Sequence, residues 1–209
     1  AKIGETGKIG TITVNIARLT DVSTADELAA AAAQGGAIRL TEDITTGQDL
    51  ALRGSTVVDL NGKTLTTGGY DIDFYDKAIM RNGSIDVANY SDSLLVDTGA
   101  NALFENCAMS SCTGNSSVFL NGTATLKDCT LSRDGAGNNI LGNRGFKLNM
   151  LGDIRMNGTI QLADKSVVSA LSGTYNFDPT SYVDTNTYAV SESGGIWTVS
   201  VKYTFHLMK

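Results

Sequence analysis

A repeat of about 22 residues runs through the chain and constrains its fold more than any other feature. Asn106-Cys107-Ala108-Met109 returns as Asp128-Cys129-Thr130-Leu131. The position of the two cysteines recurs at residues 83, 107, 129, 152 and 173, with spacings of 24, 22, 23 and 21 residues. Two residues after each of these positions stands a large apolar side chain: Ile85, Met109, Leu131, Ile154 and Tyr175. Regular self-similarity with this period predicts a solenoid, in which each repeat is one coil stacked on the coil before it.

Within a repeat, short stretches of alternating apolar residues are separated by turn-forming pairs such as Asn-Gly and Asp-Gly, which predicts strands joined by tight turns. Five residues separate Met80, Phe104 and Leu126 from the apolar residues at 85, 109 and 131. In a plain strand this odd spacing would turn the two side chains to opposite faces. A left-handed residue between them corrects the direction, and residue types that tolerate that conformation stand there: Asn82, Asn106 and Asp128. Asn61-Gly62 fits as an earlier member of the series, with Leu65 one place out of register.

These patterns predict an all-β fold in which residues 37–178 form a parallel β-helix of about six coils. A leucine-rich repeat has a similar period, but its L-x-x-L-x-L signature is absent. A jelly roll or a β-sandwich would contain many strands without a reason for one position to recur at this spacing. The β-helix is therefore the preferred interpretation.

Residues 20–36 are predicted to form a capping helix at the start of the solenoid. Thr24 and Glu27 fit a capping box, a run of alanines follows, and Gly35-Gly36 ends the helix. Such a helix would cover the open end of the first coil, whose core and strand edges would otherwise be exposed.

Residues 1–19 are predicted to form an arm outside the capped solenoid. In this arm Ile12, Val14 and Ile16 alternate with polar residues, which predicts a strand. The arm either packs along the flank of the solenoid or engages another chain.

Residues 179–209 are predicted to close the other end with a segment that ends in a β-hairpin, turned at Gly194-Gly195. Its second strand has the strongest alternation in the chain, with Trp197, Val199, Val201, Tyr203, Phe205 and Leu207 on one face. That face either closes the last coil or forms an assembly surface. The candidate assembly residues at the two ends are Ile12, Val14, Ile16, Trp197, Val199, Tyr203 and Phe205.

Two segments resemble a known family. LSGTYNFDPTSYVDTNTYAVSESGGIWTVS, which begins at residue 171, is similar to the closing segment of right-handed parallel β-helix proteins of bacteria and their phages. ADELAAAAAQGGAIRLTEDI resembles the helix-to-strand entry of pectin-lyase-like β-helices, and the two segments together cover about 50 of 209 residues. The resemblance implies a single-stranded right-handed coil and is closest to phage capsid-decoration and head-fibre proteins. Such closures also occur on adhesins and enzymes, so the resemblance is specific for the fold and weak for the function.

Charge and composition exclude several classes of function. With a net charge of −6 and no basic stretch, the chain lacks the footprint of a nucleic-acid or anionic-membrane partner. The single histidine, His206, and three cysteines without a C-x-x-C spacing provide too few ligands for a zinc site. We therefore predict no catalytic residue, no metal site and no cofactor.

One acidic pair is a candidate for chemistry, because enzymes with the resembled fold usually cleave acidic polysaccharides. Asp71 and Asp73 share one face of a predicted strand, about 7 Å apart. This separation suits the carboxyl pair of an inverting glycosidase or a cation site. The alternative is a solvated outer face, with Ile72 and Phe74 turned inward.

Cys107 and Cys129 also allow two interpretations. Stacked in neighbouring coils about 4.8 Å apart, they would be close enough for a disulfide. Their side chains would lie alongside each other, however, so bonding would strain the strands, and buried free thiols are the preferred interpretation. The predicted stacked core comprises Ile85, Cys107, Met109, Cys129, Leu131, Ile154 and Tyr175.

Two functions follow as hypotheses. The first is a non-catalytic structural virion protein of a phage, assembled in the host cytoplasm. It would be bound to the capsid protein or to sister subunits through its arm, as a homo-oligomer with a trimer favoured. The second is a carbohydrate-binding or carbohydrate-cleaving β-helix, such as a depolymerase or a secreted surface adhesin, with a cell-surface glycan as its partner.

Overall fold

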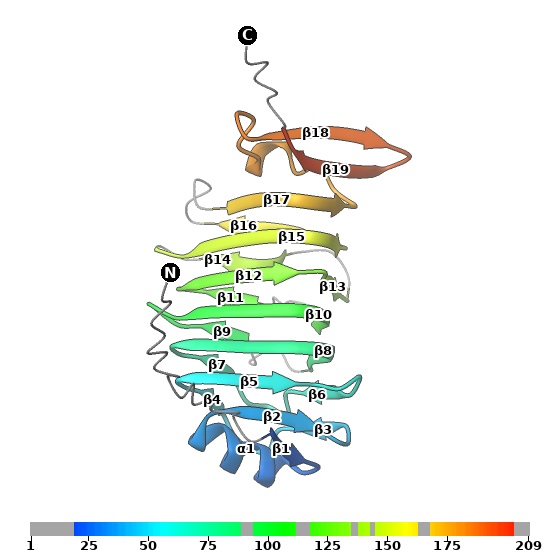
Figure 1. Ribbon diagram of the computed structural model, residues 1–209. Coiled ribbons are helices and arrows are strands. Elements are labelled where there is room, and N and C mark those ends of the chain that lie inside the picture. The colour runs from blue at the N-terminus through cyan, green and yellow to red at the C-terminus, as the bar shows by residue number, and fades with distance from the viewer. Residues whose placement is uncertain are drawn as a thin grey trace, which may run out of the picture.

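The computed structural model describes residues 19–88, 94–111, 118–134, 138–142, 145–162 and 168–202. Over these residues the chain is a parallel β-helix of about six coils, which confirms the predicted fold (Figure 1). Five of the predicted assembly residues and the single histidine lie outside the described residues: Ile12, Val14, Ile16, Tyr203, Phe205 and His206.

Two sheets form the wall of the solenoid. The larger sheet has 13 strands, ten of which follow the order β1-β2-β5-β8-β10-β12-β15-β17-β19-β18. These are β1 (Leu19–Val22), β2 (Ala37–Leu40), β5 (Ser55–Asp59), β8 (Lys77–Val87), β10 (Asn101–Ser111), β12 (Thr123–Lys127), β15 (Lys147–Met156), β17 (Val168–Tyr175), β19 (Ile196–Val201) and β18 (Tyr188–Ser193). Three further strands pair beside this path: β3 (Ile44–Thr45), β6 (Thr64–Thr66) and β13 (Thr130–Arg133).

The smaller sheet contributes one strand to each of six coils, in the order β16-β14-β11-β9-β7-β4. Its strands are β4 (Leu50–Leu52), β7 (Ile72–Phe74), β9 (Leu94–Val96), β11 (Val118–Leu120), β14 (Asn138–Gly142) and β16 (Thr159–Leu162). The pairs are parallel, so equivalent positions of successive coils lie directly above one another.

The predicted repeat is the spacing of this stacking. Met80 lies opposite Phe104 and Ile85 opposite Met109, both at 24 residues. Met109 in turn pairs with Leu131 at 22 residues. All seven residues of the predicted stacked core are buried, because side chains alternate between the interior and the outer face along each strand.

At two corners the predicted register is wrong. Leu65 was predicted to lie one place out of register, but it pairs with Ile85 and is in register. Leu65 lies seven positions after Val58, whereas Ile85 lies five positions after Met80, the partner of Val58. The turn at Asn61-Gly62 absorbs the additional residues.

The second error is at the step from β13 to β15, where Leu131 pairs with Met156 and not with Ile154. Leu126 pairs with Met150 in the same step. Six residues separate Met150 from Met156, one more than separate Leu126 from Leu131, so the corner in β15 is longer. Ile154 itself pairs with Tyr175, as predicted.

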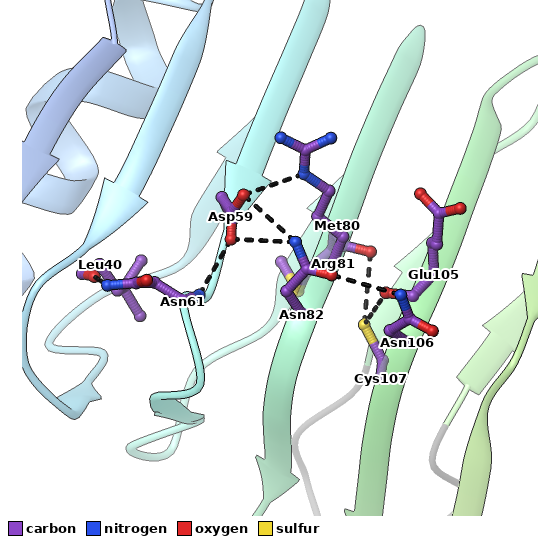
Figure 2. A network of polar contacts seen from close by, with 9 residues as sticks. All are labelled: Leu40, Asp59, Asn61, Met80, Arg81, Asn82, Glu105, Asn106 and Cys107. Atoms are coloured by element: carbon purple, nitrogen blue, oxygen red, sulfur yellow. Dashed lines mark hydrogen bonds and ion pairs between the residues drawn. The ribbon is translucent and has the colours of Figure 1, made fainter.

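The three predicted left-handed residues are confirmed, and Asn61 has the same conformation at the equivalent corner of an earlier coil. Asn61, Asn82, Asn106 and Asp128 have φ values of 54°, 62°, 53° and 54°. Asn61 Nδ2 donates a hydrogen bond to the carbonyl of Leu40 in the preceding coil (3.1 Å), and Asn106 Nδ2 donates to Asn82 Oδ1 (3.4 Å). These side chains therefore join neighbouring coils at the corner as well as turning the backbone (Figure 2).

Beside this corner, one outward column of the larger sheet alternates in charge. We call this column the charge ladder, and its members are Asp21, Arg39, Asp59, Arg81, Glu105 and Lys127. Ion pairs join Arg39 to Asp21 (2.8 Å), Arg81 to Asp59 (3.0 Å) and Lys127 to Glu105. Figure 2 shows Asp59 accepting hydrogen bonds from Arg81, from Asn82 and from the backbone of Asn61.

Both ends of the solenoid are closed as predicted. α1 (Ala25–Gln34) has the capping box of Thr24 and Glu27, and its buried residues Leu28, Ala31 and Ala32 cover the first coil (Figure 1). At the other end β18 and β19 form an antiparallel hairpin, and β19 also pairs antiparallel with β17. A short 3₁₀ helix, η2 (Thr180–Tyr182), lies in the closing segment.

Candidate functional site

The acidic pair lies on the outer face of the smaller sheet. In β7, Ile72 and Phe74 are fully buried, and Asp73 between them points outward and is partly exposed. Asp71 immediately precedes the strand, and its backbone N–H donates to Asp49 Oδ1 of the preceding coil (3.1 Å). The inward and outward directions predicted for this segment are therefore those of the structure.

The surroundings of Asp73 favour its protonated form. Burial raises the pKa of the Asp73 carboxyl above its ordinary value, and the negative charge of Asp71 raises it further. The Tyr75 hydroxyl, 3.4 Å from Oδ2, opposes this by donating to the carboxylate, while Asp49 and Asp97 act in the same direction as Asp71. Asp73 Oδ1 is buried without a hydrogen-bond partner. Asp73 thus holds its proton to a higher pH than an ordinary surface carboxyl does.

A carboxyl of raised pKa beside a second carboxyl is the arrangement of an acid–base pair in glycoside hydrolysis. On the same flank the Arg53 guanidinium stacks 3.9 Å from the centre of the Tyr75 ring. In the next coils the positions equivalent to Asp73 are apolar and partly exposed: Leu95, Phe119 and Leu141. Over the described residues, no group of three or more His, Cys, Asp or Glu side chains is arranged to hold a metal ion.

A second candidate site is the base of the solenoid, where β1 forms the end of the larger sheet. Among the described residues β1 pairs with β2 alone, and an open depression of about 630 Å³ lies along it, lined by Leu19, Thr20, Asp21, Gln34 and Gly35. A second depression of about 240 Å³ lies between β1 and α1 and includes Val22, Ala30 and Ala31. The predicted boundary of the capping helix is wrong here, because residues 20–22 belong to β1 and the helix begins only at Ala25. The sequence LTDV has no complete alternation, so it did not indicate a separate strand.

The closing hairpin packs the two described assembly candidates, Val199 and Trp197, against the core and does not present them on an assembly surface. Val199 is only 2% exposed and belongs to the core of the chain, and Trp197 is partly buried against the same core. Their apolar character is explained by the closure of the last coil, since they lie opposite Gly173 and Tyr175 of β17. Val201, further along β19, is 43% exposed.

Cys107 and Cys129 are free thiols inside the solenoid. Cys107 donates to the carbonyl oxygen of Met80 (3.3 Å) and Cys129 to that of Phe104 (3.3 Å), each reaching the preceding coil. Burial raises the pKa of Cys107 to about 12 and that of Cys129 to about 11. Such thiols are poor nucleophiles near neutral pH, so these cysteines are core residues and not a reactive site. Cys112 lies outside the described residues.

The charge ladder was not recognised in the sequence, although a signal for it exists. Asp59, Arg81, Glu105 and Lys127 are spaced by 22, 24 and 22 residues, which is the repeat period, and their signs alternate. A search for charge at the coil period would have found them.

No family model, no curated protein and no solved structure matches the chain. None of the helices in the described part of the chain is long and apolar enough to span a membrane.

Proposed function

We propose that the chain is a non-catalytic structural protein of a phage virion, a capsid decoration or head fibre. It is attached through its N-terminal arm and carries the β-helix outward. The observation that supports this most directly is the position of β1. The chain enters the solenoid at the outermost strand of the base, beside the cap α1, so an arm that precedes Leu19 is available at that end.

Two further features support a structural protein that is attached at the end where the chain enters the solenoid. The far end is closed by the antiparallel hairpin of β18 and β19, which ends the parallel stacking within the described residues. The ion pairs of the charge ladder and the hydrogen bond from Asn106 to Asn82 join neighbouring coils along the outer wall. The resemblance of the closing segment to phage β-helix proteins favours a virion over other settings.

The experiment is a comparison of the full chain with a variant lacking residues 1–18, which keeps β1 complete. Particles are purified from the phage or prophage whose genome encodes the chain, and the chain is quantified in them by mass spectrometry. The full chain is expected in the particles and the shortened variant in the unbound fraction, with equal circular dichroism spectra. The chain's absence from particles contradicts the virion assignment, and equal binding of both forms contradicts attachment through the arm.

A second candidate function is binding or cleavage of a carbohydrate, and the observation in its favour is the raised pKa of Asp73 beside Asp71. The chain is incubated with acidic and with neutral polysaccharides, and reducing ends and unsaturated products are measured. Cleavage that is lost in Asp73→Asn but kept in Glu105→Gln, an acidic residue of the other sheet, would favour this function. No product and no binding to any glycan would exclude it for the polysaccharides tested.

A further inference from the structure

We propose that the outer edge of β1 is a strand-addition site for residues 11–16 of a second copy of this chain. The inference deepens the attachment role proposed above, because it names a partner for the arm. Its test uses the purified chain alone, so its outcome is independent of binding to a virion.

The first step of the argument is the state of β1. In the part of the chain that the structure describes, this strand is the last of the larger sheet and pairs through one edge with β2, from Leu19 opposite Ala37 to Val22 opposite Leu40. The backbone N–H and C=O groups of its other edge point away from the solenoid, and such an edge accepts another strand. Leu19 on this strand is 45% exposed.

The second step is the space beside that edge. The depression of about 630 Å³ runs along Leu19, Thr20 and Asp21 and is bounded by the end of α1 at Gln34 and Gly35. The adjoining depression has small apolar residues of α1 in its wall, Ala30 and Ala31, next to Val22. An added strand therefore has backbone partners on β1, and its alternate side chains face the part of α1 where Ala30 and Ala31 lie between Glu27 and Gln34.

The third step selects the occupant. Ile12, Val14 and Ile16 form the alternating pattern of a half-buried strand. Only Ala17 and Arg18 separate this segment from β1. For the segment to fold back on its own β1, these two residues would form a two-residue hairpin turn, which requires positive φ and favours Gly, Asn or Asp. Alanine and arginine are poorly suited to it, so a second copy is the preferred receiver.

The fourth step is the register. With an antiparallel strand on β1, Val14 opposite Thr20 places Ile12 opposite Val22, and opposed residues share a face of the sheet. Val22 is the buried residue of β1, so the aliphatic side chains of the arm lie on the side of α1 and its alanines. Thr13 and Asn15 then lie on the other face. In a pair or a ring, each copy gives one strand and receives one.

The experiment traps this contact with cysteines in the full chain, in which Cys112→Ser removes one native thiol while buried Cys107 and Cys129 are kept. Val14→Cys and Thr20→Cys are made in separate chains, which are unfolded together, refolded and mildly oxidised. We expect a covalent dimer containing one chain of each kind on a non-reducing gel. The matched pair Thr13→Cys and Thr20→Cys should give none, because these side chains lie on opposite faces.

A second readout is the mass in solution by light scattering. The full chain is expected to be an assembly, Val14→Lys to be a monomer, and Thr13→Lys to remain assembled, all with the same circular dichroism spectrum. The proposal is overturned by a monomeric full chain or by an assembly that survives Val14→Lys. A Val14→Cys/Thr20→Cys double variant is also refolded and oxidised by itself. The proposal is equally overturned if its cross-link forms only within one chain, or if no cross-link forms in either experiment.

Discussion

Four residues with left-handed backbone, Asn61, Asn82, Asn106 and Asp128, turn the chain at the same corner of successive coils. A left-handed conformation costs a residue with a Cβ atom about 1–2 kcal/mol, and asparagine and aspartate bear it better than others because their side chains form local hydrogen bonds. In β15 a glycine, Gly152, has positive φ (76°) at the corresponding corner. Each coil thus uses one of the few residue types that its corner permits.

This corner gives a prediction for Asn106, which is exposed and bonded to Asn82. Asn106→Ala is expected to lower the free energy of unfolding by about 1 kcal/mol, because alanine disfavours positive φ. Asn106→Gly should be close to neutral, because glycine adopts this conformation freely. Urea denaturation of both variants tests this. Equal losses in the two would mean that the lost side-chain hydrogen bond is responsible and not the backbone conformation.

The buried thiols predict a loss of stability in alkali. A cysteine in the unfolded chain ionises near pH 9, whereas the pKa of Cys107 is about 12 and that of Cys129 about 11 in the folded chain. Above pH 9 the unfolded state therefore binds fewer protons than the folded state, and the free energy of unfolding falls as pH rises. Each thiol contributes a slope of at most about 1.4 kcal/mol per pH unit.

Denaturation curves at pH 8, 9 and 10 check this expectation. Below pH 9 the contribution of the thiols is fully present, and above pH 9 the curve of Cys107→Ala should fall less steeply than that of the natural chain. Parallel curves for the two chains would show that Cys107 does not carry the effect.

At the scale of elements, the charge ladder makes each long strand complementary to the strands above and below it. Arg81 lies between Asp59, with which it forms an ion pair, and Glu105. Lys127 has one acidic neighbour within the charge ladder, Glu105, and pairs with Leu151 on its other side. The four side chains are 19–42% exposed, and each ion pair contributes little alone, about 0–1 kcal/mol.

Charge reversal should therefore have a larger effect inside the ladder than at its end. Arg81→Glu is expected to lower the free energy of unfolding by about 1 kcal/mol more than Arg81→Gln does, because it places like charges opposite each other on both sides. Lys127→Glu, which creates one such contact, should have about half this effect. The difference should shrink in high salt. An effect of Arg81→Glu that is insensitive to salt would point to packing and not to charge.

At the scale of the whole molecule, the solenoid is a stack whose ends are its weak points. Each coil contacts its neighbours, so the first coil would expose its core without α1. Leu28 of α1 is 1% exposed and packs in the core cluster of the first coils. The cap is therefore part of the folded body and not an appendage.

Leu28→Ala is expected to lower the free energy of unfolding by about 2–4 kcal/mol, as other buried leucines do when truncated. It should also promote aggregation, because the uncovered coil end offers apolar surface and strand edges. Ala33→Ser, on the exposed side of the same helix, is the matched control and should have little effect. Thermal unfolding and light scattering measure both properties. An unchanged midpoint in Leu28→Ala would contradict the capping role.

Much of this architecture is determined by the sequence alone, because it rests on local patterns. The repeat period, the inward stack from Ile85 to Leu131, the left-handed corner and the capping box each depend on a few neighbouring residues. Alternation along a strand and the preferences of asparagine and glycine are read without knowing what lies above or below.

The tertiary structure alone decided what depends on residues about one coil apart. Whether Leu131 meets Ile154 or Met156 depends on the number of residues accommodated in the corner of β15, which no local pattern reports. The ion pair of Asp59 with Arg81 and the raised pKa of Asp73 likewise arise from contacts between coils. β1 exists as a strand because β2 lies beside it, and its outer edge is exposed because no further coil lies beyond it in the described chain.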